Sequence, residues 1–184
     1  MTVLPTFTTG QVLTSSDANS MANSGLVFVK SQTVGTGVTG VTVSSAFSAD
    51  YDSYRVVIDG GLGSTVNAGL SLTFGATATG YAYGYGYFSN GVAGGVGDGA
   101  AAYITVGQIN TNFSSTAFDV FSPFLARYTA VFGGNSYDLN NGNSRGPYNG
   151  VLKNTTSYTA FTLTAASGTI TGGTITVYGY RKGN

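Results

Sequence analysis

From Gly25 onward, apolar and polar residues alternate in short runs along the chain. In one run every second residue is apolar, at Leu70, Leu72 and Phe74. This period of two predicts a strand with one buried and one exposed face. Similar runs, or short continuous apolar stretches, recur at 26–29, 38–47, 54–59, 81–87, 103–106, 117–121, 127–132, 158–164 and 174–180.

Turn signals separate these runs, and no helical pattern alternates with them. The pattern therefore predicts an all-β fold, an antiparallel β-sandwich of roughly eight to ten strands over residues 25–184. Eight strands in two sheets favour a jelly-roll-like arrangement. A Greek-key sandwich of the immunoglobulin type also fits the strand count, but the chain has no Cys or Trp to form its usual core.

Two segments rich in glycine or asparagine are predicted to be loops. The first is 91–99, where glycine recurs at nearly every second position, and the second is 133–150.

Residues 1–24 differ from the rest of the chain and are predicted to form an N-terminal arm. Thr14 precedes Asp17 by three residues, which is a capping pattern for a helix start. A helix over 16–23 would have two turns and would be too short to be stable alone in water. The arm is therefore expected to dock on its own domain or on a neighbour.

The residue types that the chain lacks bear on its chemistry. It contains no His, Cys or Glu. General acid–base catalysis and metal binding depend mainly on these residues, Asp and Lys. We therefore expect a protein that is not an enzyme and that needs no cofactor or metal.

Two acidic segments are candidates for calcium sites. Asp50 and Asp52 could supply carboxylates, although a capped turn before the strand that begins near Tyr54 explains them more simply. The segment 138–143 misses the spacing of an EF-hand loop and lacks its final Glu.

The charge of the chain indicates which kinds of partner it can bind. The formal net charge is zero, only 8% of residues are charged, and the cations are not clustered. Nucleic acid is therefore not expected as a partner. No apolar run approaches the ~20 residues of a membrane span, and the N-terminus does not resemble a secretory signal. A neutral, sparsely charged surface is easier to explain if much of it is buried against other subunits.

The segment 81–87 carries a tyrosine at every second position: Tyr81, Tyr83, Tyr85 and Tyr87. Their rings are expected to stand on one face of one strand. They form either a packed sheet face or an aromatic contact surface for sugar rings or a neighbouring subunit.

Three segments resemble virion proteins of tailed bacteriophages. Phe7–Asn19 resembles an F-x-x-G-x-x-L-T-x-x-x-x-N opening found at the virion-proximal end of fibre and appendage proteins. Phe47–Ile58 is similar to an F-S-x-x-Y-D-x-Y segment of small β-rich phage structural proteins, which often end in V-Y-G-Y-R, as at Val177–Arg181 here.

The resemblance implies an exterior protein of the capsid or tail that forms a homotrimer and contacts other virion proteins. It would be made in the host cytoplasm and act as a decoration protein or short fibre. The arm residues expected to make the attachment are Phe7, Gly10, Val12, Leu13, Asp17, Asn19 and Met21. The alternative is an adhesin that binds host-surface carbohydrate through the tyrosines and the two predicted loops.

Overall fold

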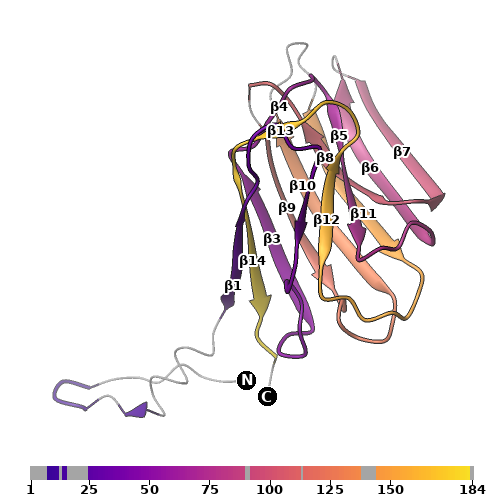
Figure 1. Cartoon of the computed structure of the whole chain (residues 1–184). Coiled ribbons are helices and arrows are strands. Elements are labelled where there is room, and N and C mark those ends of the chain that lie inside the picture. Colours follow the sequence, from indigo (N-terminus) through magenta and orange to yellow (C-terminus); the bar gives the residue numbers. More distant parts are fainter. Residues whose placement is uncertain are drawn as a thin grey trace.

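The computed structural model describes residues 8–12, 14–15, 25–89, 92–112, 114–137 and 144–182. Within these residues the chain forms antiparallel strands that pack as two main sheets, so the prediction of an all-β antiparallel sandwich is confirmed (Figure 1). The strands are β1 (Leu26–Thr33), β2 (Gly40–Val43), β3 (Ser53–Asp59), β4 (Leu62–Gly63), β5 (Ala68–Phe74), β6 (Tyr81–Ser89), β7 (Val92–Ala101), β8 (Ile104–Ile109), β9 (Ser114–Phe121), β10 (Thr129–Tyr137), β11 (Ser144–Leu152), β12 (Phe161–Ala165), β13 (Ile170–Thr171) and β14 (Thr174–Tyr180).

The larger sheet has eight strands in the order β1-β14-β3-β9-β10-β11-β6-β7, and the smaller sheet has four in the order β2-β12-β5-β8. A two-stranded ribbon joins β13 to β4. Figure 1 shows the large sheet running from β1 on the left to β7 on the right. The large sheet is therefore wider than the sheet that covers it.

The core lies between the two sheets and is built from the alternating positions that the sequence indicated. Val56 and Val177 of the large sheet, and Leu72 and Phe74 of the small sheet, are buried. Phe47, in the loop after β2, packs its ring 4.8 Å from that of Tyr54 and 5.6 Å from that of Phe161. Because aromatic rings from both sheets meet here, this cluster fixes how the sheets face each other.

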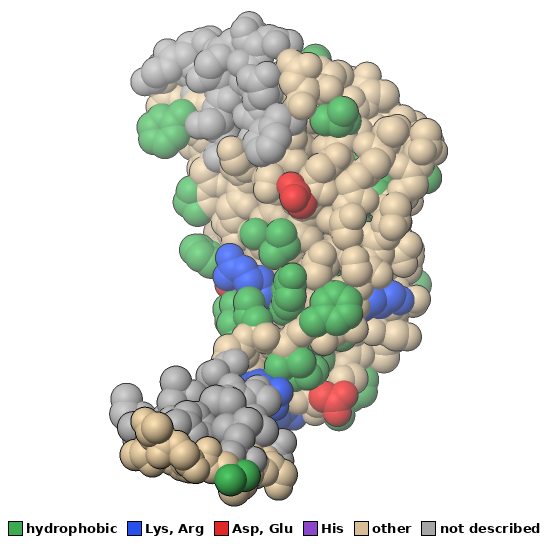
Figure 2. Space-filling model, turned by 90° about the vertical axis from the view of Figure 1, so that its left-hand side faces the viewer, with side chains coloured by type: hydrophobic (Ala, Val, Ile, Leu, Met, Phe, Trp, Pro, Cys, Tyr) green, Lys and Arg blue, Asp and Glu red, His purple; other side chains and the backbone are tan. Residues whose placement is uncertain are grey.

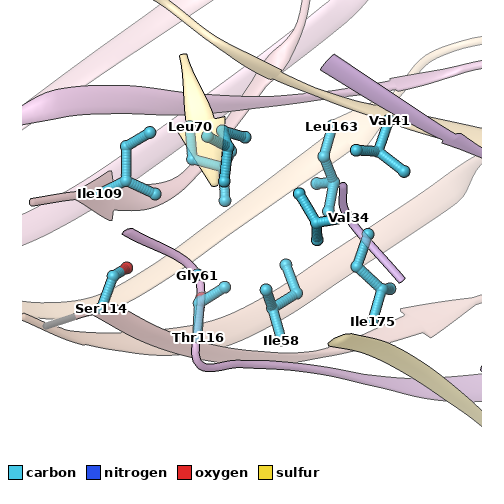
Figure 3. A pocket seen from close by; sticks show the side chains of 11 residues that line it. Val34, Val41, Ile58, Gly61, Leu70, Ile109, Ser114, Thr116, Leu163 and Ile175 are labelled. Carbon is cyan, nitrogen blue, oxygen red and sulfur yellow. The ribbon is translucent and has the colours of Figure 1, made fainter. Parts of the chain in front are cut away.

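One small gap remains in this core. It is lined mainly by aliphatic side chains, including Ile58, Leu163 and Ile175, and has a volume of about 20 Å³ (Figure 3). That is close to the space of one water molecule. The gap therefore has no room for a ligand and reflects imperfect packing.

Two hairpins, β6–β7 and β10–β11, make the large sheet wide. They add their four strands beyond β9, and the edge strand β8 of the small sheet packs against β10, β11 and β6. Gly150 of β11 lets this packing be close, because a Cβ there would lie 2.7 Å from the side chain of Ile104 in β8. Among the described residues, the strands that pack closely on β8 do not include β7, so the outer part of the β6–β7 hairpin extends beyond the small sheet as an overhang.

The prediction that 91–99 and 133–150 are loops is wrong for most of their length. Val92–Ala101 is strand β7, and 133–150 contributes the end of β10 and most of β11. Glycine hides these strands in the sequence because it adds nothing to the apolar alternation. Here it pairs across the ladder instead, as in Gly84–Gly97 and Gly86–Gly95. These strands, and the two ribbon strands β4 and β13, raise the count above the predicted eight to ten.

Candidate binding surfaces

The four tyrosines of β6 do not have equal surroundings. Tyr81 is fully buried, and its hydroxyl accepts a hydrogen bond from the Phe74 N–H at 2.9 Å and donates one to the Thr77 carbonyl at 3.2 Å. Burial raises the pKa of Tyr81 to about 12. Tyr81 therefore belongs to the core, where it ties the large sheet to the end of β5.

The other three tyrosines are half-buried and continue along the inner face of the overhang. The rings of Tyr83 and Tyr85 are nearly parallel, with centroids 6.2 Å apart and planes 4° apart. The ring of Tyr103, which precedes β8 and is 38% exposed, lies 6.1 Å from that of Tyr83 with planes 21° apart. Tyr103, Tyr83, Tyr85 and Tyr87 together are called the tyrosine ladder below.

Strand β7 borders the ladder with little side-chain bulk. A Cβ at Gly94 would lie 2.6 Å from the Tyr87 ring, so that ring lies directly over the glycine. Val96 is 44% exposed and is the cross-strand partner of Tyr85 in the β6–β7 pairing. Asp98 pairs with Tyr83, is exposed, and accepts a hydrogen bond from the Ala100 N–H at 2.8 Å.

The polar groups of this surface are mostly open. Among the described residues, the hydroxyls of Tyr83, Tyr87 and Tyr103 have no hydrogen-bond partner. Two cationic residues lie on or just after strand β11, beside this surface: Lys153 Nζ donates to the Gly99 carbonyl at 3.4 Å, and Arg145 pairs with Tyr87 across the β11–β6 ladder.

The opposite face of the large sheet carries a second surface, called the outer face below. One row of paired residues crosses all eight strands, and it begins at the β1 edge with Phe28, Tyr178, Arg55, Asp119 and Phe132. The row continues through Asn149, Gly84 and Gly97 to β7. Large side chains therefore stand over β1 to β10, and small ones over the two hairpins.

Aromatic side chains on the outer face are open to solvent. Phe28 is 61% exposed, Phe132 56% and Phe121 41%. Phe28 packs edge-on against Tyr178, with ring centroids 6.3 Å apart. Figure 2, which views the molecule from the β1 side, shows exposed hydrophobic side chains beside a cationic group at the mid-height of that side. An exposed aromatic cluster of this kind is typical of an interaction surface.

The charges on the outer face neutralise each other. The guanidinium of Arg55 lies 3.5 Å from the carboxylate of Asp119, and the Tyr180 hydroxyl donates to the same carboxylate at 2.7 Å. Hydrogen bonding to Tyr180 and the negative charge of Asp119 raise the pKa of Arg55. Burial and the bond to Asp119 raise the pKa of Tyr180.

Two open depressions lie on this face beside Phe132. One, of about 370 Å³, is lined by Arg55, Asp119, Phe132, Gly134 and Pro147 among others. The other, of about 730 Å³, lies over the hairpins and has mostly small lining residues, including Ala82, Gly84, Gly97, Ala130 and Asn149. The outer face thus combines projecting rings with open hollows.

Of the carboxylates considered as metal ligands, Asp50 and Asp52 have protein partners, and the segment 138–143 lies outside the described residues. Asp50 accepts a hydrogen bond from Ser48 Oγ at 2.9 Å, and Asp52 lies 3.0 Å from Lys182 Nζ. Within the described part of the chain, no three acidic residues come together in a group that could hold a metal ion.

Only two of the predicted attachment residues fall in the described part of the arm. Gly10 has φ +86° and lies in a turn in which the Gln11 N–H donates to the Thr8 carbonyl at 3.0 Å. Val12 is 81% exposed. Phe7, Leu13, Asp17, Asn19, Met21 and the helix predicted over 16–23 lie outside the described residues.

The outer face is not predicted from the sequence, although the sequence carries a signal for it. Phe121, Phe132 and Tyr178 occupy positions that alternate with the core residues, so these strands carry aromatic side chains on the face away from the core as well. The period of two in the sequence indicates three members of the tyrosine ladder, Tyr83, Tyr85 and Tyr87, but it also includes the buried Tyr81 and does not indicate Tyr103.

No family model, no curated protein and no solved structure matches this chain. Among the described residues, no helix is long and apolar enough to cross a membrane.

Proposed function

We propose that this chain is a non-enzymatic structural protein of a bacteriophage virion, exposed on the capsid or tail. It assembles as a homotrimer through its outer face and is attached by its N-terminal arm. The resemblance of Phe7–Asn19, Phe47–Ile58 and Val177–Arg181 to phage appendage proteins supports the virion setting.

The observation that carries the proposal is the exposed aromatic cluster of the outer face. Phe28, Phe121 and Phe132 expose apolar rings to water. On the same face, the charges of Arg55 and Asp119 offset each other. Aromatic residues with few net charges are characteristic of the centre of a protein–protein interface. A chain of zero net charge also gains solubility when such a face is covered.

A second copy of the chain is the partner that fits this face best. Projecting rings and hollows lie close together on it, since Phe132 lines one depression and a second, lined mostly by small residues, lies over the neighbouring hairpins. If the rings of each copy enter the hollows of the next in the same rotational sense, the contact is heterologous, whereas a reciprocal contact between two copies would be isologous and give a dimer. A heterologous contact that closes on itself produces a ring such as a trimer.

The strand order supports a jelly-roll-like description of the subunit. Without the ribbon strands β4 and β13 and the hairpins β6–β7 and β10–β11, eight strands remain. In sequence order they are arranged as 1-8-3-6 in one sheet and 2-7-4-5 in the other. The first pairs with the eighth, the second with the seventh, and so on, as in one long hairpin rolled into two sheets.

The position of β1 supports attachment by the arm. Leu26 pairs with Tyr180, so β1 begins at one end of the sandwich. A segment placed there can reach a virion surface while the outer face contacts sister subunits.

The assembly claim is tested by the solution mass of the full-length protein. Light scattering after size exclusion is expected to give three times the chain mass for the wild type and one chain mass for Phe132→Asp. The matched control is Val66→Asp, which introduces the same charge at a position that is 49% exposed between β4 and β5. A monomeric wild type, or a Phe132→Asp variant that remains trimeric, would refute assembly through the outer face.

The attachment claim needs virions that carry the protein. Deletion of residues 1–20 is expected to abolish incorporation while leaving the solution mass per assembly unchanged apart from the deleted residues. Normal incorporation of the deletion variant would contradict attachment by the arm.

A further inference from the structure

We propose that the tyrosine ladder is a binding site for a neutral oligosaccharide. It lies on the inner face of the β6–β7 overhang, and the outer face is the opposite side of the same sheet. Sugar binding at the ladder therefore does not depend on the assembly proposed above, and both can occur in one subunit.

The ladder offers a row of ring surfaces that the fold leaves partly uncovered. Tyr103, Tyr83 and Tyr85 follow one another at centroid distances of 6.1 and 6.2 Å, with nearly parallel planes. Aromatic surfaces of this kind bind the C–H-rich faces of pyranose rings. A row of them suits a chain of sugar units better than one compact ligand.

The polar groups around the rings select for hydroxyl-rich ligands. The hydroxyls of Tyr83, Tyr87 and Tyr103 can each donate and accept, and no described residue occupies them. One carboxylate oxygen of Asp98 accepts from Ala100, which leaves the other available, and an ionised carboxylate can only accept. Sugar hydroxyls supply the donors that this carboxylate requires.

The charge at the site argues for a neutral rather than an acidic sugar. Asp98 would repel a uronate or sialate carboxylate bound over Tyr83, its pairing partner in β6. Lys153 Nζ is directed to the Gly99 carbonyl, and Arg145 pairs with Tyr87 at the other end of the ladder, so the repulsion by Asp98 acts at the Tyr83 end of the site.

The glycines of β7 keep the site open. Gly94 lies beneath the Tyr87 ring, and nothing lies within 4 Å of a Cβ built on Gly99. Because β7 contributes few large side chains, a ligand can approach the ring row from this side.

Calorimetric titration of the full-length protein with neutral hexasaccharides tests the site. The probes are maltohexaose, cellohexaose, laminarihexaose, chitohexaose and α-1,6-mannohexaose, with hexagalacturonate as the acidic comparison. We expect saturable binding of at least one neutral probe and none of hexagalacturonate. Tyr103→Ala and Tyr87→Ala should each weaken binding by about tenfold, and Asp98→Asn by less.

The matched control is Tyr128→Ala, which removes a ring that is 58% exposed and lies outside the tyrosine ladder, and should leave sugar binding unchanged. Tyr103→Phe separates the two contributions at this position, since it keeps the ring but loses the hydroxyl, and should weaken binding less than Tyr103→Ala. Failure of all five neutral probes to bind would overturn the proposal, as would binding that Tyr103→Ala and Tyr87→Ala leave intact. A change of solution mass in these two variants without sugar binding would instead assign the ladder to a subunit contact.

Discussion

The hydroxyl of Tyr148 lies 2.7 Å from Oγ1 of Thr116, and both side chains are buried between the sheets. Thr116 Oγ1 also lies 2.9 Å from the Val106 carbonyl of β8. A chain of hydrogen bonds, in which the Tyr148 hydroxyl donates to Thr116 Oγ1 and Thr116 donates to the Val106 carbonyl, satisfies all three groups. This polar connection joins the two sheets at the point where the hairpins begin to widen the larger one.

Two buried threonines provide a first prediction. Thr116→Val should lower the free energy of unfolding by about 1–3 kcal/mol, because it leaves buried partners unsatisfied. Thr129→Val should be neutral or slightly stabilising, since Thr129 Oγ1 is buried without a hydrogen-bond partner among the described residues. Urea unfolding of both variants checks this, and equal losses in the two would show that the difference in bonding does not matter.

The buried tyrosines predict a loss of stability at high pH. Burial raises the pKa of Tyr148 above its ordinary value and that of Tyr81 from 10.0 to about 12. Above pH 10 the unfolded chain releases these protons while the folded protein keeps them, so unfolding becomes more favourable. The stabilising contribution of Tyr81 is complete below about pH 10 and is lost as the pH rises through about 12.

Each such tyrosine adds a slope approaching about 1.4 kcal/mol per pH unit in that range. Urea unfolding at pH 9, 10 and 11 measures it. Tyr148→Phe should make the decline shallower, whereas Tyr128→Phe, at a position that is 58% exposed, should leave it unchanged. A wild-type stability that does not fall between pH 10 and 11 would contradict the effect.

Two neighbouring glycines in β10, Gly133 and Gly134, allow a matched pair of alanine substitutions to be compared. A Cβ at Gly133 would overlap the Ala117 carbonyl and lie 2.6 Å from the Phe118 side chain, whereas a Cβ at Gly134 would meet nothing within 4 Å. Gly133→Ala should therefore cost about 1–3 kcal/mol, and Gly134→Ala should stay within about 0.5 kcal/mol of the wild type. Thermal and urea unfolding measure both, and a harmless Gly133→Ala would mean that β9 and β10 can separate at little cost.

In the cluster of Arg55, Asp119 and Tyr180 on the outer face, Tyr180 is expected to contribute more to the free energy of unfolding than Arg55. Tyr180→Phe removes a 2.7 Å bond to the Asp119 carboxylate and should cost about 1 kcal/mol. Arg55→Met should cost about 0–1 kcal/mol, because the guanidinium is 40% exposed and 3.5 Å away. A double-mutant cycle with Asp119→Asn gives both coupling energies, and a larger coupling for Arg55 would reverse this ranking.

The sequence predicted the central strands well because their cores alternate strictly. Leu70, Leu72 and Phe74 are buried, and Ser71 and Thr73 lie between them at half-buried positions. The β7 strand could not be predicted in this way, since Val92–Ala101 has an exposed or half-buried residue at every position before Ala101. Its conformation is imposed by pairing with β6, which is a tertiary effect that no local pattern encodes.

The tyrosine-bearing surface could be predicted in part from the sequence, whereas the outer face could not, for a related reason. The tyrosine spacing placed the rings on one face, but only the width of the small sheet determines that Tyr81 is buried while Tyr83 and Tyr85 are partly open. The outer face depends on the register of eight strands, which brings Phe28, far from it in sequence, into one row with Phe132. Such long-range register lies beyond a reading of single segments.

The pairing of β1 with β14 also determines how the subunit would respond to force. Strand β1 enters the sheet at Leu26 and runs antiparallel to β14 along its length, with Thr33 paired to Thr174 at the far end. A pull on the arm along the axis of β1 shears this ladder, so its hydrogen bonds share the load instead of breaking in succession. A particle tethered through the arm would therefore hold its subunits against drag by the pairing geometry of one edge strand.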